Sequence, residues 1–457
     1  MARLMTRIGF GTLGLLAGLG APRLAAQSWA LPASDPVGIA RGGTGVAYGN
    51  SLEAAALNPA LLATLRDGNS AYVAVGLELQ AAKTTLQANQ IVQYSVDRNR
   101  FLPALGANWS LGPALMLGLK IDEPFLRHVE MPANYAGRFN GEAFNLDTHR
   151  MEAQLGWAIT PNWAAGASLG VTQIQYSWDN MIRTVVENPN PLAPPNSPMG
   201  LMESDLRQKG SAFAPSYSLG FRWAPNSRWT VAGVYVGSIS ATLPLRASYG
   251  STAPSYYGLD GVSSPQVGTS QAGAAQRGVT QLGAGRNTIT LPGKVTVGVR
   301  QRVNQLFTWE MDLRYVLGSQ TVMPGMPSAT VPGASPVSGP GVGSSYANGL
   351  GLSVMGELNL TKRWVVRLGA SMDPSLRTDN NVEPLIGGAK TAGFSGGFGW
   401  KVFGGQVNAG YQYRQSQNVR TPNLQGSWPS TGYAPVQGTT QVEGMGHLLS
   451  IGYKRSF

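Results

Sequence analysis

The last eleven residues of the chain, HLLSIGYKRSF, alternate between apolar and polar positions. One face of the extended strand that they predict carries Leu449, Ile451, Tyr453 and Phe457. The other face carries small or polar residues. A strand with lipid on one side and a polar lumen on the other alternates with this period of two. Because the chain stops on an aromatic residue at the lipid-facing phase, the pattern predicts the closing strand of a transmembrane β-barrel.

The same alternation recurs along the chain and predicts fourteen strands. They are expected near 70–80, 101–111, 114–122, 146–158, 162–177, 209–224, 228–246, 288–302, 306–318, 348–360, 363–373, 391–402, 405–416 and 444–457. Short turns alternate with long connections between them. Bacterial outer-membrane barrels have an even strand number, short periplasmic turns and long external loops. The expected fold is therefore all-β, a fourteen-stranded antiparallel transmembrane β-barrel over residues 70–457.

Tryptophan supports this orientation. Eight of the eleven Trp lie near a short turn at the outward phase, namely Trp109, Trp157, Trp163, Trp223, Trp229, Trp309, Trp364 and Trp400. This placement is typical of the aromatic girdle at a membrane interface. A soluble β-sandwich also alternates, but it has no reason to gather Trp at one end of its strands.

Residues 1–26 have the pattern of a secretory signal peptide. Arg3 and Arg7 precede the short apolar run 8–21, and small residues follow near Ala25 and Ala26. That run is shorter than the roughly 20 residues that span a bilayer, so membrane residence is expected to come from strands. The absence of Cys fits an exported chain. These features predict a location in the cell outer membrane.

Charged residues occupy the inward phase of two neighbouring predicted strands. They are Lys294, Arg300, Glu310, Asp312 and Arg314. We expect Lys294 and Arg300 to face Glu310 and Asp312 across the hairpin and to form a charge ladder in the lumen. Two interpretations stay open: the charges pair and hydrate the barrel interior, or they hold the anionic head of a ligand.

Composition and motifs argue against other classes of protein. The net charge of +11 is scattered without a Lys/Arg block, so nucleic-acid binding is not expected. GxGxxG at 9–14 lies in the signal peptide, and GxSxG at 393–397 lies inside a strand. The three His have no metal-ligand spacing. His149 has Met151, not Ser, two residues later, unlike an outer-membrane phospholipase. We expect no enzyme activity, no cofactor and no metal.

The segment before the first strand carries the most specific motifs. It contains IARGGTGVAYGNSLEAAALNPALLATL, with Gly42, Gly43 and Gly45 followed by Asn58-Pro59-Ala60. In this order of motifs the chain resembles the FadL/TodX family of outer-membrane transport proteins for long-chain fatty acids and other hydrophobic compounds. Departures exist, because Leu61 follows the Asn-Pro-Ala motif and Arg455 holds a penultimate position that is more often aromatic.

Later segments extend the resemblance over most of the chain. Pro124-Phe125 and the run 136–139 match a family pattern, although Leu126 replaces a Gly. ITLPGKVTVGVR, VVRLGASMD and HLLSIGY also resemble family strands. The resemblance implies that residues 27–69 form a hatch that plugs the lumen, with Gly42, Gly43, Gly45 and Asn58-Pro59-Ala60 as hatch and gating residues.

The resemblance also implies a passive mechanism. A hydrophobic molecule is captured among external loops, enters an internal pocket and leaves sideways when the hatch shifts, near a kinked third strand with Asp122, Pro124 and Phe125 at its end. The expected third loop, 178–208, is apolar, and its candidate capture residues are Met181, Ile182, Val185, Val186 and Leu201. Packing of these side chains against other loops or lipopolysaccharide is the competing interpretation.

Two other functions compete with transport of hydrophobic compounds. A FadL-related barrel of the PorV type serves as a component of a protein secretion system and carries similar N-terminal motifs. A general porin admits polar solutes, but a free aqueous path needs no hatch. The expected partners are hydrophobic small molecules, outer-membrane lipids and the barrel-assembly machinery, with Tyr453 and Phe457 as the assembly signal. The chain is expected to be a monomer.

Overall fold

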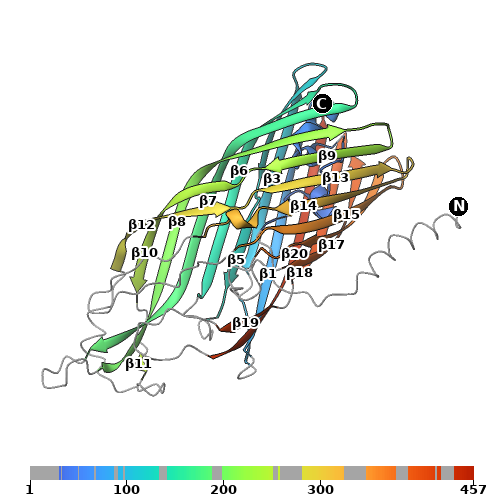
Figure 1. Cartoon of the computed structure of the whole chain (residues 1–457). Coiled ribbons are helices and arrows are strands. Elements are labelled where there is room, and N and C mark those ends of the chain that lie inside the picture. The colour runs from blue at the N-terminus through green and yellow to red at the C-terminus, as the bar shows by residue number, and fades with distance from the viewer. Residues whose placement is uncertain are drawn as a thin grey trace.

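The computed structural model shows a barrel of long tilted strands (Figure 1). It describes residues 30–31, 33–49, 51–65, 68–86, 91–95, 98–132, 141–187, 198–250, 256–257, 280–323, 346–376, 390–416, 419–423 and 437–457. The signal peptide expected over residues 1–26 lies outside this part of the chain and stays a prediction.

Antiparallel strands form the wall. The main strands are β1 (Ser70–Leu86), β3 (Arg98–Ser110), β4 (Leu115–Asp122), β5 (Leu126–Glu130), β6 (Ala143–Ala158), β7 (Trp163–Glu187), β8 (Pro198–Trp223), β9 (Trp229–Val236), β10 (Ile239–Gly250), β12 (Thr280–Leu291), β13 (Lys294–Arg302), β14 (Phe307–Val316), β15 (Gly349–Asn359), β16 (Trp364–Asp373), β17 (Thr391–Val402), β18 (Gly405–Ser416) and β20 (Gln437–Ser456). Short β2 (Ile91–Tyr94), β11 (Tyr256–Tyr257) and β19 (Val419–Asn423) pair with β1, β8 and β20.

Pairing around the wall confirms the predicted strand number and closure. Each wall strand pairs with the next along the chain, from β1 and β3 round to β18 and β20. Three wall strands are interrupted, and they consist of β4 with β5, β9 with β10, and β12 with β13. With each interrupted pair counted as one strand, the seventeen main strands make the fourteen wall strands that the sequence predicts.

The seam between the two ends of the barrel is long. β1 pairs with β20 from Ser70 opposite Ser456 to Leu86 opposite Thr440. At the seam the backbone N–H of Phe457 donates to the carbonyl of Asn69 at 2.9 Å. The Phe457 side chain is 71% exposed on the outer face. The aromatic terminus therefore ends the closing strand on its lipid side.

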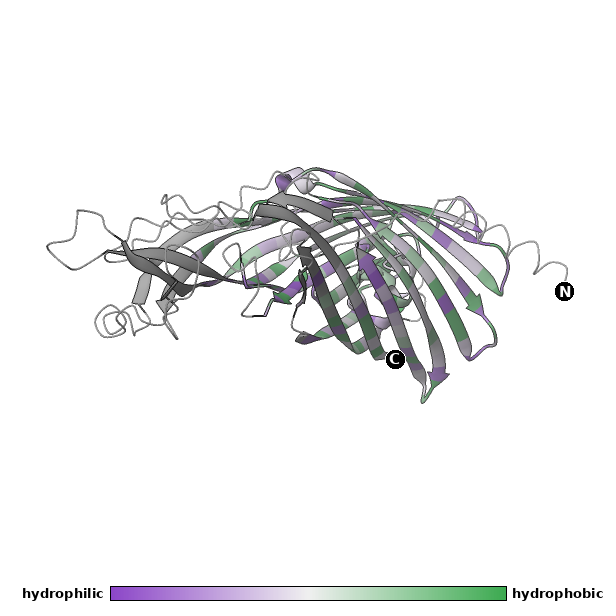
Figure 2. Ribbon diagram, turned by 90° about the horizontal axis from the view of Figure 1, so that it is seen from below, coloured by the Kyte–Doolittle hydropathy of each residue, from purple (hydrophilic) through white to green (hydrophobic). Residues whose placement is uncertain are grey.

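Apolar side chains cover the outer face, and Figure 2 shows apolar and polar residues alternating along the strands. Trp163 stacks on Trp223, and Trp364 stacks on Trp400, with ring centroids 5.6 and 5.5 Å apart. Trp229 meets Trp309 edge to face at 6.0 Å. Because these pairs lie beside short turns, they form the aromatic girdle that the sequence predicts at one end of the strands.

The expected third loop is instead an extended hairpin. β7 and β8 stay paired as far as Glu187 opposite Pro198, so the prediction of a loop over 178–208 was wrong for most of its length. Of the candidate capture residues, Met181, Ile182, Val185 and Val186 lie on β7, and Leu201 lies on β8. β-Branched residues such as those near the end of β7 favour strands. The side chains of all five residues lie outside the described part.

Short helices occupy the lumen (Figure 1). They are α2 (Pro36–Ala40), α3 (Leu52–Ala55) and the 3-10 helix η1 (Pro59–Thr64), and their N-caps are Asp35, Ser51 and Asn58. Each cap side chain accepts from backbone N–H groups of the first turn, as such residues do at helix starts. A second 3-10 helix, η2 (Gly318–Gln320), follows β14. No helix in the described part is long and apolar enough to cross a membrane.

Deletion of Phe457 is expected to lower the amount of folded protein in the outer membrane, because the aromatic residue ends the closing strand on its lipid side. Quantitative immunoblotting of outer-membrane fractions measures the effect. Replacing the exposed turn residue Phe403 with Ser serves as a control that leaves the closing strand intact. Wild-type levels of the deletion variant would contradict a role for this residue in assembly.

Candidate functional site: a plugged lumen with an apolar chamber

Two wall carboxylates hold the glycine turn of the hatch. The N–H groups of Gly45 and Val46 donate to Asp312 Oδ2 at 2.9 and 3.2 Å, and the N–H of Ala47 donates to Glu310 Oε1 at 2.7 Å. Gly42 and Gly43 have φ of 66° and 78°, a region that favours glycine. The Gly-rich motif thus bends the hatch so that consecutive amides point at β14.

These contacts correct the predicted charge ladder. Arg300 lies opposite Glu310 as expected, but Lys294 lies opposite Val316, and Gly298 lies opposite Asp312. The prediction that Lys294 faces these carboxylates was therefore wrong. The carboxylates accept hydrogen bonds from the hatch backbone, which the alternation of residues within β13 and β14 could not reveal. Arg300 lies over the Tyr48 ring, with its guanidinium carbon 4.4 Å from the ring centroid.

A second hatch contact centres on Glu357 of β15. Its Oε2 accepts from Arg41 at 2.9 Å and from Arg367 at 2.8 Å, and its Oε1 accepts from the Tyr48 hydroxyl. Arg41, Arg367 and Glu357 are all buried. Burial and the Glu357 carboxylate raise the pKa of Tyr48 to about 12, so the phenol keeps its proton and donates. A buried charge without a partner destabilises the folded state. Arg41, Arg367 and Glu357 therefore stabilise one another.

The Asn-Pro-Ala motif fixes the far end of the hatch. Asn58 is fully buried, and its Nδ2 donates to the carbonyl of Val46 at 2.9 Å and to that of Phe221 on β8 at 3.2 Å. Its Oδ1 accepts from the N–H of Ala60 at 3.1 Å. Pro59, which lacks an N–H, occupies the first helical position where no donor is needed. Asn58 therefore links the hatch to itself and to the wall.

Glycines of the wall make room for this motif. A Cβ at Gly220 would lie 2.0 Å from Asn58 Oδ1, one at Gly166 would lie 2.3 Å from the Ala60 nitrogen, and one at Gly156 would lie 2.7 Å from Leu62 Cβ. Gly166 pairs with both Gly156 and Gly220 across neighbouring strands. This row was missed at the sequence level, although inward-phase glycines aligned on consecutive strands were a usable signal.

Above the hatch, toward the long-loop end, the inward side chains are apolar. We call this region the apolar chamber, defined by the buried residues Phe125, Val129, Met131, Phe144, Leu146, Ile174, Tyr176, Trp178, Ala214, Ile239, Ala241, Leu243, Ile289, Leu291, Met323 and Leu376. Phe144 meets Tyr176 and Trp178 edge to face, at 5.9 and 5.6 Å. Such a lining favours an apolar occupant over a polar one.

A charged band lies directly below the apolar chamber. Lys120 pairs with Glu152 at 3.0 Å, and Arg150 makes a two-pronged contact with Asp122 at 2.7 and 2.6 Å. Lys120 also donates to the carbonyl of Ala56 in the hatch at 2.8 Å. Arg314 pairs with Asp373 on the opposite side of the lumen. The lumen therefore changes from apolar to charged along its axis.

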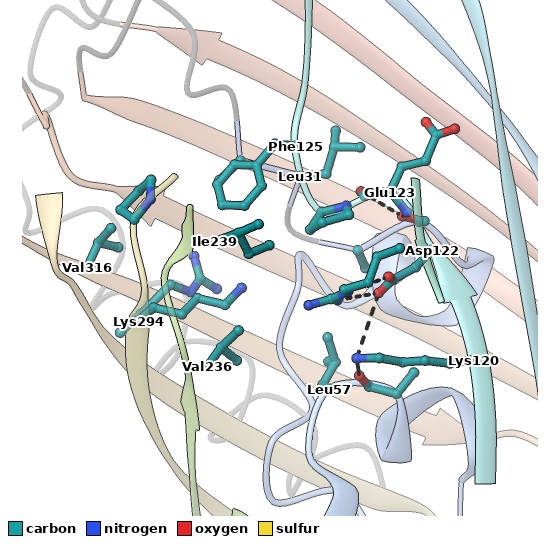
Figure 3. Close-up of a pocket in the computed structure, with 18 of the residues that line it drawn as sticks. Leu31, Leu57, Lys120, Asp122, Glu123, Phe125, Val236, Ile239, Lys294 and Val316 are labelled. Atoms are coloured by element: carbon teal, nitrogen blue, oxygen red, sulfur yellow. Dashed lines mark hydrogen bonds and ion pairs between the residues drawn. The ribbon is translucent and has the colours of Figure 1, made fainter. Parts of the chain in front are cut away.

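A cavity of about 90 Å³ lies at this boundary. Its lining combines Leu31 of the hatch with Phe125, Ile239 and Val316 of the apolar chamber region and with the charged Lys120, Asp122 and Lys294 (Figure 3). Of the predicted luminal charges, Lys294 and Arg314 therefore reach the cavity. All three wall interruptions contribute lining residues, namely Glu123 and Pro124, Gly237, and Pro292.

The third wall strand breaks beside this cavity. β4 ends at Asp122, β5 begins at Leu126, and Pro124 between them cannot donate to a ladder. β3 pairs with β4 only as far as Leu105 opposite Ile121. Across the fully described range 98–132, the upper part of β3 has no ladder with β5. Phe125 turns into the lumen, and its N–H donates to Thr148 Oγ1 at 2.9 Å. The third wall strand is thus interrupted at Glu123, Pro124 and Phe125.

The described residues contain no cluster of His, Cys, Asp and Glu suited to a metal ion. The arrangement of a closed barrel, an internal plug and an apolar chamber defines a plugged outer-membrane channel. The family model for outer membrane protein transport proteins (OMPP1/FadL/TodX) matches residues 22–457, and the chain belongs to this family of outer-membrane transport proteins.

Solved structures share the fold at low sequence identity. A FadL homologue of Pseudomonas aeruginosa is 15% identical with a TM-score of 0.73, covering 94% of this chain and all of that one. The Ralstonia pickettii toluene transporter TbuX is 15% identical with a TM-score of 0.60, and the P. putida toluene transporter TodX is 13% identical with a TM-score of 0.62. Each alignment with these two covers 93% of this chain and 99% of the other. No curated protein matches the sequence.

Replacing Glu357 with Gln is expected to loosen the hatch, because it leaves Arg41 and Arg367 buried without their carboxylate. Loss of one partner of a buried ion pair costs about 3–5 kcal/mol, which corresponds to at least about a hundredfold faster amide exchange in the hatch. Hydrogen-exchange mass spectrometry of residues 36–49 measures this. Exchange as slow as in the wild type would show that the hatch is held elsewhere.

Replacing Gly220 with Ala is expected to displace the Asn-Pro-Ala motif, because the new methyl group would overlap Asn58 Oδ1. The matched control is Gly396 to Ala, whose Cβ meets its nearest neighbour at an ordinary 3.4 Å. Exchange of the 51–65 amides should rise in the first variant and not in the second. Equal behaviour of the two variants would refute the close-contact explanation.

Proposed function

We propose that this protein is a channel for passive uptake of hydrophobic compounds, such as long-chain fatty acids or compounds of similar polarity, across the outer membrane. The observation that carries the proposal is the apolar chamber, a cluster of buried apolar side chains that borders the cavity above the hatch. A polar solute gains nothing from such a lining, whereas transfer of apolar surface from water is favourable by roughly 25 cal/mol per Å². The fold shared with the toluene transporters TbuX and TodX supports the same class of cargo.

Passage requires the hatch to shift. The cavity of about 90 Å³ is smaller than the roughly 150 Å³ void that accommodates benzene in an engineered protein. Leu31 and Leu57 of the hatch line this cavity, so movement of the hatch would enlarge it. Gly42, Gly43, Gly45 and Asn58-Pro59-Ala60 are the residues that would set the resting position. No energy source is needed when the compound moves down its gradient.

Exit is proposed to occur sideways through the wall. The charged band below the apolar chamber is a poor path for an apolar molecule, because burying such a molecule against ion pairs displaces their solvation. The break beside Asp122, Pro124 and Phe125 interrupts strand pairing in the wall at the level of the cavity, and it would serve as the exit. A compound leaving there would meet the lipid of the membrane. The hairpin that carries Met181, Ile182, Val185, Val186 and Leu201 would provide the first capture surface outside.

The alternatives predict other properties. A general porin needs an open aqueous path, whereas here the hatch packs against the wall at Gly156, Gly166 and Gly220, which argues against that function. A component of a secretion system needs a surface for a protein partner, and the chamber would then have no role. Lipids on the outer face and a monomeric state are part of the proposal, and neither distinguishes transport from secretion.

Liposome uptake tests the proposal. Asn58 to Ala combined with Pro59 to Gly should change the uptake rate of a labelled long-chain fatty acid while barrel heat stability stays unchanged, because strand pairing is untouched. Deletion of residues 27–60 should in addition admit a small sugar. Wild-type uptake of the fatty acid that never exceeds that of empty liposomes would refute transport of that class and favour the secretion alternative.

A further inference from the structure

Polar side chains cross the break between β3 and β5. The Arg100 Nη2 donates to His128 Nδ1 at 3.1 Å and to Asp147 Oδ2 at 3.3 Å. His128 Nε2 lies 2.6 Å from Asp147 Oδ1. The partners indicate that Nδ1 accepts and Nε2 donates, because a guanidinium offers only donors and a carboxylate only acceptors. We call these three residues, from β3, β5 and β6, the Arg100 bridge.

The bridge passes from the inner to the outer face of the wall. Leu102 and Ala104 are buried at the inward phase of β3, and Arg100 shares their phase. Asp147 shares the phase of the exposed Met151 on β6. The guanidinium therefore reaches through the break, and the Arg100 side chain is 44% exposed within it. In an intact wall no side chain could follow this path, because a backbone ladder would fill it.

A second polar pair lies in the same break. His149 Nδ1 of β6 is 2.8 Å from Oε1 of Glu123, the residue that follows β4. Glu123 is buried, whereas the His149 side chain is 45% exposed. Two of the three histidines of the chain, His128 and His149, thus contact carboxylates at the break in the third wall strand. Side-chain contacts take the place of the missing backbone pairs there.

The height of the bridge fits a passage into the outer part of the membrane. Arg100 lies nine residues above Trp109 of the girdle on the same strand. At about 3.3 Å per residue and a tilt of roughly 40°, this puts it about 20–25 Å above the girdle. That height is near the outer edge of an apolar band about 25 Å tall, where charged side chains cost little. The break below it lies within the band.

We propose that the Arg100 bridge is a latch on the lateral passage, with Arg100 as the residue that positions β5 against β3 and keeps the break closed at rest. This inference rests on the proposed lateral exit of a hydrophobic compound. Opening requires the guanidinium to leave His128 and Asp147 and Leu126 to leave Leu102, with which it packs in one buried cluster. No ladder between β3 and β5 has to break in the described range 98–132. A cargo that shifts β5 would separate these contacts and pass beneath them.

Cysteine labelling tests the latch without relying on transport. The chain has no Cys, so Leu126 to Cys places a single thiol on β5, at a side chain that is fully buried behind the break. In proteoliposomes, a membrane-soluble maleimide should modify this thiol about fivefold faster after Arg100 to Ala, the change expected from loss of an exposed charged contact. Asp147 to Asn, which keeps the side-chain shape, should act in the same direction.

The matched control is Arg207 to Ala. Arg207 forms an outward ion pair with Asp179 at 2.8 Å, but the two residues lie opposite each other in the continuous β7–β8 ladder. Faster labelling in the Arg100 and Asp147 variants alone supports the latch. Unchanged labelling in both, or an equal rise in the Arg207 variant, overturns it.

Uptake of the labelled fatty acid then separates the two proposals. With the latch removed, uptake should be faster than in the wild type and in the Arg207 variant. If the wild type takes up no fatty acid, the proposed transport of that class fails while the labelling result still decides the latch. If labelling rises but uptake does not, the bridge closes the break without limiting passage, and its role as a latch on transport is overturned.

Discussion

Hydrogen bonding between the hatch backbone and buried wall carboxylates is the interaction on which the rest of the lumen depends. Asp312 and Glu310 accept three consecutive hatch amides, and Glu357 joins Arg41 to Arg367. These carboxylates stand inside a closed barrel, where a charge without partners is costly. The hatch supplies partners for one oxygen of Asp312, one of Glu310 and both of Glu357. The hatch thus stabilises the buried charges of the barrel wall as well as filling the lumen.

The lumen combines an apolar surface with a charged one. The apolar chamber binds an occupant by the hydrophobic effect, which is non-directional and does not select one apolar compound over another. The charged band below it offers directed contacts that are already made among Lys120, Asp122, Arg150 and Glu152. A cargo in the cavity therefore finds a favourable side and a side whose polar groups are occupied. This contrast is the physical reason for the sideways exit toward lipid that we propose.

Much of the fold was predictable because membrane strands follow a simple rule. A lipid-facing residue at every second position fixes strand phase, and turns such as 224–226 mark strand ends, so the strand number, girdle and closing strand followed from sequence. Strand length at the external end was less predictable. Above the membrane the outer face no longer needs apolar residues, so the alternation fades and the β7–β8 extension looked like a loop.

The candidate site was predictable only in outline. The Gly-rich and Asn-Pro-Ala motifs identified the hatch, but the partners of its amides depend on how the hatch sits against strands hundreds of residues later. Lys294 illustrates this limit, since a hairpin pattern assigned it to Glu310 and Asp312 while the register puts it opposite Val316. The Arg100 bridge could not be predicted either, because its contacts depend on how distant strands are placed. It unites three strands at an irregularity that no alternation predicts.

The seam between β1 and β20 has a consequence for how the molecule comes into being. The hatch leads directly into β1, and the partner of β1 is the last strand of the chain. Contacts between residues so far apart in sequence form late and slowly. Because the hatch directly precedes β1, we expect its packing in the lumen to be coupled to the closing of this seam. Closing of the barrel around the hatch is therefore expected to be a late and slow step of folding.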